Sequence, residues 1–378
     1  MSAYLDNAAT TKPCRACIDA MLNALTETYG NPSSLHGMGL SAQLAVDAAR
    51  AQIAAALGAE KESVLFTSGA TESNNMAVLG TAARYGKRAK KAVVTTVEHA
   101  SVRAAFDTLE AQGFNVVRIA PQDNPADFAA AFADAVDNNT FLASMMLVNN
   151  ETGHILPVKE AFAAVKRKNP QVITHCDAVQ GFLKVPFRAA DLHADLITVS
   201  GHKVHGAKGI GALWHQKGVK LGSLLHGGEQ ENGIRPGTES VPLIVGFGAA
   251  VKEMRVTIDE RRAYCKTLRQ ACIEQLSAIE GVTVQSPIDG SPFILSFSVK
   301  GLRSETLLHF LEEREVYVSS GSACSKGKQS GVLQQFGIPD HRADSTIRVS
   351  FCAENTLEDI RTLTSLVALA HQTLIHKR

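Results

Sequence analysis

The chain has 378 residues, a formal net charge of +1, and 45% hydrophobic against 20% charged residues. This composition is typical of a soluble globular protein, and the length exceeds the size at which one hydrophobic core keeps growing, so we expect one large and one smaller domain. The near-zero charge gives no electrostatic reason to expect nucleic acid or an anionic membrane as a partner.

The N-terminal sequence MSAYLDNAATT lacks the basic start and apolar stretch of a secretory signal. The stretch that most resembles a membrane segment, residues 241–251, is far shorter than the roughly 20 residues that span a bilayer. Seven cysteines scattered along the chain fit reduced thiols better than a disulfide framework. We therefore expect a cytoplasmic protein that has no membrane partner.

Between residues 63 and 214, short β-branched stretches alternate with helical patterns. Strands are expected at SVLFTS, AVVTTV, NVVRIA, TFLASMMLV, QVITHCD, ADLITVS and GALW, and helices at 71–87, 99–112, 125–136 and 157–168. This alternation predicts an α/β fold in which a mainly parallel seven-stranded sheet is sandwiched by helices. Ligands bind such sheets beyond the carboxyl ends of the strands. Polar and glycine-rich stretches follow the strands there, namely SGATES, VEHAS, NNETG, DAVQG and SGHK.

After about residue 254 the pattern changes to that of a smaller α+β domain. Its expected elements are a charged helix at 259–279, strands near 281–285 and 293–299, a helix at 304–314, the strands VYVSS and TIRVSF, and a helix at 356–375. We therefore divide the chain into a large domain of residues 15–255 and a small domain formed by residues 1–14 and 256–378.

Lys203 lies between two histidines in a stretch that follows the predicted strand ADLITVS. A lone loop lysine is usually a solvated surface residue. Here a second residue suits the same chemistry. Asp177 closes the strand VITHC, and a buried carboxylate at that position would keep a pyridinium nitrogen protonated. SGATES opens a helix whose free backbone N–H groups suit a phosphate. Together these pieces favour a Schiff-base lysine and pyridoxal 5'-phosphate over the turn and cap roles that each piece alone would allow.

A series of motifs extends this pattern over nearly the whole chain. They are YLDNAATT (4–11), GNPSSLH (30–36), FTSGATESNN (66–75), VEHAS (97–101), VNNETG (148–153), HCDAVQG (175–181), SGHKVHGAKGIGAL (200–213), GIRPGT (233–238), SSGSAC (319–324) and IRVSF (347–351). Through them the chain resembles the cysteine desulfurase family, the NifS/IscS-like group in the class-V aminotransferase branch of fold-type I pyridoxal phosphate enzymes.

The resemblance implies a role for each cofactor-site residue. Lys203 would hold pyridoxal 5'-phosphate through a Schiff base, and Asp177 would pair with the ring nitrogen. Gln180 would hydrogen-bond the ring hydroxyl, while His99 would stack on the ring face and shuttle protons. The further cofactor-binding residues are Ala70, Thr71, Ser200, His202 and, reaching the neighbouring subunit of a homodimer, Thr238, the last four on the phosphate.

The resemblance also implies how the substrate is used. Arg348 would bind the carboxylate of L-cysteine with help from Asn150, a task that suits a planar bidentate donor. Cys324 would take the sulfur as a persulfide, leave L-alanine, and pass the sulfur to an acceptor protein of iron–sulfur cluster assembly or tRNA thiolation. Its loop, SSGSACSKGKQSG, has the composition of an exposed, mobile segment whose lysines favour the thiolate.

Three other functions remain open at this stage. A selenocysteine lyase would use the same pocket, an aminotransferase would need no mobile thiol, and a catalytically silent scaffold for sulfur transfer would bind no cofactor. A metalloenzyme is not indicated, since the sequence has neither HExxH nor paired CxxC motifs. The single CxxC formed by Cys14 and Cys17 fits two helix thiols without function better than a redox pair or half of a metal site.

Overall fold

The computed structural model describes residues 2–320 and 331–374. Contacts divide the chain into two compact units. The large unit comprises Lys12–Leu147 and Leu156–Val256, and the small unit comprises Met1–Thr11, Val148–Ile155 and Thr257–Arg378. One long helix, α8 (Val241–Ser277), carries the chain across the boundary at residue 256, where the sequence indicated a helix only from residue 259. None of the described helices is both long and apolar enough to cross a membrane.

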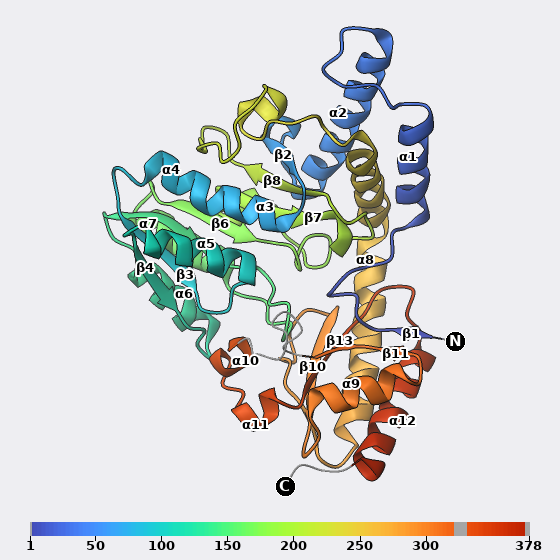
Figure 1. Cartoon of the computed structure of the whole chain (residues 1–378). Helices are drawn as coiled ribbons and strands as arrows, with labels where there is room; N and C mark the ends of the chain where they lie inside the picture. The colour runs from blue at the N-terminus through green and yellow to red at the C-terminus, as the bar shows by residue number, and fades with distance from the viewer. Residues whose placement is uncertain (1, 321–330, 375–378) are drawn as a thin grey trace. The chain divides into compact units, whose positions relative to one another are not determined.

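Seven strands in the described part of the large unit form one sheet, in the order β2-β8-β7-β6-β5-β3-β4 (Figure 1). The strands β3 to β7 pair in parallel, and β8 runs antiparallel to both β7 and β2. The strands are β2 (Val64–Thr67), β3 (Lys91–Thr95), β4 (Asn115–Ile119), β5 (Thr140–Ser144), β6 (Ile173–Asp177), β7 (Leu196–Ser200) and β8 (Gly211–His215). The predicted mainly parallel seven-stranded sheet is confirmed.

The large unit also contains α-helices, several of which pack against this sheet. They are α1 (Arg15–Thr26), α2 (Gly37–Leu57), α3 (Ala70–Asn75), α4 (Thr81–Tyr85), α5 (Ala100–Ala111), α6 (Pro125–Asp134) and α7 (Val158–Lys168), with a π-helical turn, Met76–Gly80, joining α3 to α4. Figure 1 shows α3, α4 and α5 in front of the sheet. Their side chains, such as Phe106, form one apolar cluster with Val94 and Leu142 of the strands. Helices α6 and α7 pack together, and the ring centroids of Phe132 and Phe162 lie 6.3 Å apart.

Local sequence explains where these helices begin and end. The side chain of Asn124 accepts a hydrogen bond from the Ala126 N–H at 2.9 Å, and Pro125 occupies the first helical position of α6. Helix α2 ends at Gly58, whose φ of 65° favours glycine. These caps satisfy backbone groups that a helix leaves unpaired at its ends.

The small unit has its own sheet. Four strands pair antiparallel in the order β12-β13-β10-β9, and β1 pairs with β11 in parallel. Its elements are β1 (Ala3–Tyr4), β9 (Val282–Val284), β10 (Ile294–Val299), α9 (Ser304–Glu312), β11 (Val316–Tyr317), β12 (Ser319–Ser320), α10 (Val332–Gln335), α11 (Asp340–Ala343), β13 (Thr346–Ser350) and α12 (Leu357–Thr373). A capping box of Thr356 and Asp359 starts α12.

Strand direction decides which residues of the large unit can meet. Because β2 and β7 are both antiparallel to β8, β2 points the same way as β3, β5, β6 and β7. The segments that follow these strands therefore leave the sheet at one edge, which we call the carboxyl edge. Most of the residues predicted to bind the cofactor lie in these segments.

Candidate cofactor and substrate sites

A tight loop presents Lys203 at the carboxyl edge. The lysine ends a 3-10 turn, Gly201–Lys203, that directly follows β7. The Gly201 N–H donates to the Ile210 carbonyl at 3.0 Å, and the Gly206 N–H donates to the Gly201 carbonyl at 2.9 Å. A Cβ added to Gly206 would lie 2.9 Å from that same carbonyl oxygen, so the loop closes only with glycine there. The backbone thus fixes the origin of the lysine side chain.

Asp177 is the last residue of β6, and it is 4% exposed. Its Oδ2 accepts a hydrogen bond from Asn74 Nδ2 at 2.8 Å, and its Oδ1 accepts one from the Val179 N–H at 3.0 Å. Both donors are uncharged. A carboxylate buried among neutral donors favours a cationic partner, which is what a protonated pyridine nitrogen would supply.

His99 caps α5 at the same edge, following β3. Its Nδ1 lies 2.8 Å from Ser101 Oγ and accepts from the Ser101 N–H at 3.2 Å. Burial is the main reason why the pKa of His99 is lowered, with the charges of Lys203 and Arg103 acting in the same direction and that of Asp177 opposing them. These electrostatic interactions show that the fold brings His99, Asp177 and Lys203 into one neighbourhood. The neutral imidazole is the form favoured there.

Glu98, next to His99, is a buried carboxyl group that sequence reasoning missed. It is 1% exposed, and its Oε1 accepts from Thr95 Oγ1 at 2.6 Å and from the Met146 N–H at 2.8 Å. Its Oε2 has no hydrogen-bond partner among the described residues. Burial raises the pKa of Glu98 to about 8, and the nearby charge of Asp177 adds to this effect. Glu98 is therefore mainly protonated at neutral pH.

The other predicted cofactor residues also lie in segments of the large unit. Gln180 is buried, and its Oε1 accepts from Lys184 Nζ at 3.1 Å. Burial, together with the charges of Lys203, Lys208 and Lys184, lowers the pKa of His202 to about 4. Ala70 and Thr71 open α3 directly after Gly69, Ser200 ends β7 and is buried, and Thr238 is exposed.

Arg348 lies in β13 of the small unit, where it is 5% exposed. Its Nη1 donates to the Asn150 carbonyl at 3.0 Å and its Nη2 to Asp6 Oδ1 at 2.9 Å. The contact with Asn150 thus uses the backbone, and Asp6 is a partner that sequence reasoning missed. Arg348 Nε is buried without a hydrogen-bond partner in the described part of the chain. The described contacts thus leave one donor of this buried guanidinium group unused.

A buried ion pair holds the loop that leads to Thr238. The Glu231 carboxylate accepts from Arg50 Nη1 and Nη2, both at 2.7 Å, and from the Phe66 N–H at 3.0 Å. Glu231 has a positive φ of 47°. The pairing fixes the loop against α2 and β2. The two glutamates of GGEQENG gave no indication of it in the sequence.

The structure describes the two cysteines of the CxxC motif but not the predicted sulfur acceptor. Cys324 lies outside the described residues. Cys14 precedes α1, and Cys17 is fully buried with its Sγ 3.8 Å from Met21 Sδ. Burial raises the pKa of Cys17 to about 11 and also raises that of Cys14. Neither group resembles a reactive thiolate.

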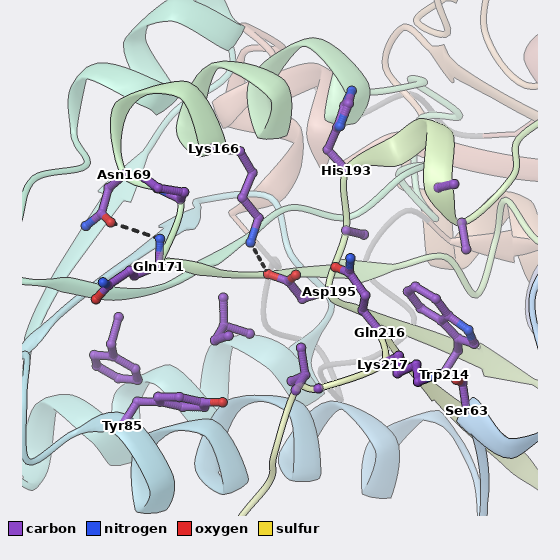
Figure 2. A pocket seen from close by; sticks show the side chains of 18 of the residues that line it. Ser63, Tyr85, Lys166, Asn169, Gln171, His193, Asp195, Trp214, Gln216 and Lys217 are labelled. Atoms are coloured by element: carbon purple, nitrogen blue, oxygen red, sulfur yellow. Dashed lines mark hydrogen bonds and ion pairs between the residues drawn. The ribbon is translucent and has the colours of Figure 1, made fainter.

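A cavity of about 1060 Å³ lies at the opposite edge of the sheet, near the starts of β5 and β6 (Figure 2). None of the described site residues predicted from the sequence lines it. Its charged pair, Lys166 and Asp195, is joined by an ion pair, and Asp195 Oδ2 also accepts from the Thr174 N–H at 2.8 Å. These two groups stabilise each other, and the cavity lies away from the residues that the sequence singled out for the cofactor.

The large unit therefore has the features of a fold-type I pyridoxal phosphate enzyme. A primary amine suits an aldehyde, a buried carboxylate suits a pyridinium nitrogen, and hydroxyl and N–H groups after β2 and β7 suit a phosphate. The side chains present fit this cofactor.

Comparison with known proteins places the chain in a family. It belongs to the aminotransferase class-V family, whose model matches residues 3–363. It is 37% identical over 362 residues to the cysteine desulfurase IscS of Methanosarcina thermophila, covering 95% of this chain and 89% of that protein. A solved NifS-like protein is 34% identical, with a TM-score of 0.94 over 99% of this chain and 100% of that one. SspA, solved in complex with cysteine, is 29% identical, with a TM-score of 0.79 over 94% of this chain and all of that one.

These comparisons confirm the resemblance to NifS/IscS-like proteins and the fold-type I architecture. Enzymes of this family depend on pyridoxal 5'-phosphate, which agrees with the residues at the carboxyl edge.

Proposed function

We propose that this chain is a cysteine desulfurase that removes sulfur from L-cysteine and releases L-alanine. The observation that carries the proposal is the grouping of Lys203, Asp177 and His99 at the carboxyl edge, in a chain whose relatives include named cysteine desulfurases. The cysteine bound in the SspA structure supports the same substrate.

Pyridoxal 5'-phosphate, when bound, supplies an electron sink for the bonds at the substrate Cα. Asp177 would hold its ring nitrogen, Gln180 its ring hydroxyl, and Lys203 its aldehyde carbon. The phosphate would be bound by the start of α3 at Ala70 and Thr71, by Ser200 and His202, and by Thr238 of a second subunit.

The chain's own groups would then move protons and bind the substrate. Once the amino group of the substrate has replaced it at the aldehyde carbon, the freed Lys203 amine would take the proton from the substrate Cα, a task for which its position on a closed loop orients it. His99, neutral because it is buried, would accept and return a proton on the ring face. Arg348, whose Nη1 contacts Asn150, would bind the substrate carboxylate with the help of that residue.

Cys324 would be the sulfur acceptor. Its thiolate attacks the substrate sulfur, the sulfur–Cβ bond breaks, and the electron pair of that bond stays on the substrate carbon. Protonation of that carbon gives L-alanine, so L-cysteine and the Cys324 thiol become L-alanine and a Cys324 persulfide. The persulfide would be passed on, in the cytoplasm, to an acceptor protein that serves iron–sulfur clusters or tRNA thiolation.

A homodimer is part of this proposal. Helix α1 exposes one stripe of apolar side chains: Ile18 is 45% exposed, Leu22 57% and Leu25 61%. On α2, Leu40 and Leu44 are 59% and 60% exposed. Contiguous exposed apolar surface favours a protein partner, and a second copy would also give the exposed Thr238 a site to complete. Leu22→Lys and Leu25→Lys together should produce monomers in sedimentation analysis, whereas a dimer that survives both changes would contradict this interface.

The test of the function uses Cys324→Ala, with Cys14→Ala as a matched control. The Cys324 variant should keep the yellow cofactor and its spectral change on adding L-cysteine, yet form no labelled persulfide from ³⁵S-cysteine and no sulfide with a reductant. Cys14→Ala should still form the labelled persulfide and still release sulfide. Sulfur release by the Cys324 variant would refute the assignment of the thiol. Faster turnover of selenocysteine than of cysteine would indicate a selenocysteine lyase instead.

A further inference from the structure

A chain of buried polar side chains joins Asp177 to His99. Asn74 Nδ2 donates to Asp177 Oδ2 at 2.8 Å and lies 2.9 Å from Ser101 Oγ, which in turn lies 2.8 Å from His99 Nδ1. Asn74 is fully buried and Ser101 is 7% exposed. Neither residue was expected from the sequence to serve the site. This series of hydrogen bonds links the Asp177 carboxylate to the His99 imidazole.

The donors and acceptors along this chain have only one consistent direction. An ionised carboxylate only accepts hydrogen bonds, so Asp177 orients the Asn74 amide with its NH₂ group toward Oδ2. The second hydrogen of the same NH₂ group is then donated to Ser101 Oγ. With the opposite amide orientation, Asn74 Oδ1 would face the Asp177 carboxylate, and two acceptors would be in contact.

The Asn74 amide in turn fixes the direction of the hydrogen bond that the Ser101 hydroxyl makes. Because the hydroxyl oxygen accepts from an amide that cannot accept in return, its own proton is left for His99 Nδ1, the only other hydrogen-bonding neighbour of Oγ among the described residues. The Ser101 N–H also donates to Nδ1, at 3.2 Å. Two donors at Nδ1 leave no place for a proton on that nitrogen.

We propose that Asn74 and Ser101 are positioning residues that fix the tautomer of His99, so that the neutral ring carries its proton on Nε2. The importance of this tautomer for catalysis rests on the function proposed above, but the tautomer itself does not. It would make Nε2 the one ring nitrogen through which His99 gives up or takes back a proton, while Nδ1 remains an acceptor. It would also couple His99 to Asp177, because the carboxylate sets the direction of every bond between them.

The test is the protonation state of His99 in the full-length holoenzyme and in the cofactor-free protein, read by ¹⁵N NMR with labelled histidine. The His99 signals are identified by their loss in His99→Gln. The proposal expects a protonated Nε2 and an unprotonated Nδ1 in the wild-type protein. A proton on Nδ1 of the neutral wild-type ring would overturn it, whether or not the enzyme desulfurates cysteine.

Three variants separate positioning from a general structural role. Asn74→Ala removes the amide that orients Ser101, so a second population with the proton on Nδ1 should appear. Ser101→Ala removes a donor that opposes the doubly protonated ring, so the pKa of His99 should rise by about 0.5 to 1 pH unit. Ser101→Thr keeps the hydroxyl and should restore the wild-type spectrum and titration. If Ser101→Ala and Asn74→Ala fold, as circular dichroism can show, but leave the His99 signals and titration unchanged, the proposal is wrong.

Discussion

Replacing Glu98 by glutamine should change how the stability of the protein depends on pH. Burial raises the pKa of this carboxyl from its ordinary value of 4.5 to about 8. Between these values the folded chain holds a proton that the unfolded chain releases, so wild-type stability falls as pH rises from 4.5 and levels off above 8. Each pH unit in this window lowers the free energy of unfolding by about 1.4 kcal/mol. Burial of this carboxyl therefore destabilises the wild-type fold by about 3 kcal/mol at pH 7.

Glutamine has the shape of the protonated acid but does not ionise, so it removes this dependence. It also places a buried NH₂ group where Oε2 has no described partner, which costs about 1–3 kcal/mol at every pH. The informative quantity is therefore how the difference in unfolding free energy between Glu98→Gln and the wild type changes with pH. The sign of that difference at a single pH is not informative. Urea denaturation at fixed cofactor concentration should show that the stability of Glu98→Gln, relative to that of the wild type, increases from pH 5 to pH 8.

Glu62→Gln is a suitable control, because that side chain is 70% exposed and the change should shift the urea midpoint little. A constant difference between Glu98→Gln and the wild type from pH 5 to pH 8 would refute the reasoning. So would a variant that loses stability relative to the wild type as pH rises, because that result requires an ionised Glu98 with favourable contacts.

Three further changes test other parts of the structure. Arg348→Lys should lower kcat/KM for L-cysteine about 30- to 100-fold, mainly through KM, because a lysine cannot replace the planar donor; an unchanged KM would exclude the carboxylate role. Glu231→Ala should destabilise the protein by about 3–5 kcal/mol in denaturant titrations, because it leaves the largely buried Arg50 charge unpaired. A loss below 1 kcal/mol would show that the pair is dispensable. Lys203→Ala should abolish the borohydride-stable attachment of pyridoxal 5'-phosphate seen by mass spectrometry, and retained attachment would point to another lysine.

The sequence alone predicted the architecture of this chain, and it supplied most of the residues proposed for the site. Alternation of β-branched and helical stretches sufficed for the parallel sheet, since buried parallel strands and their covering helices have distinct residue periods. Asp177 and Lys203 could be chosen because Asp177 ends a strand and Lys203 lies in the turn after the next one, at the edge where ligands bind such sheets.

Only the tertiary structure revealed the groups that support those residues. Asn74 lies 103 positions from Asp177 along the chain and Asp6 lies 342 from Arg348, and nothing in local sequence records such pairings. The raised pKa of Glu98 likewise depends on its burial in the folded chain and on the nearby charge of Asp177. Local pattern determines which element a residue joins, because hydrophobic period and capping act over a few residues. Hydrogen-bond direction, desolvation and charge proximity depend on distances in space, and only the fold sets those.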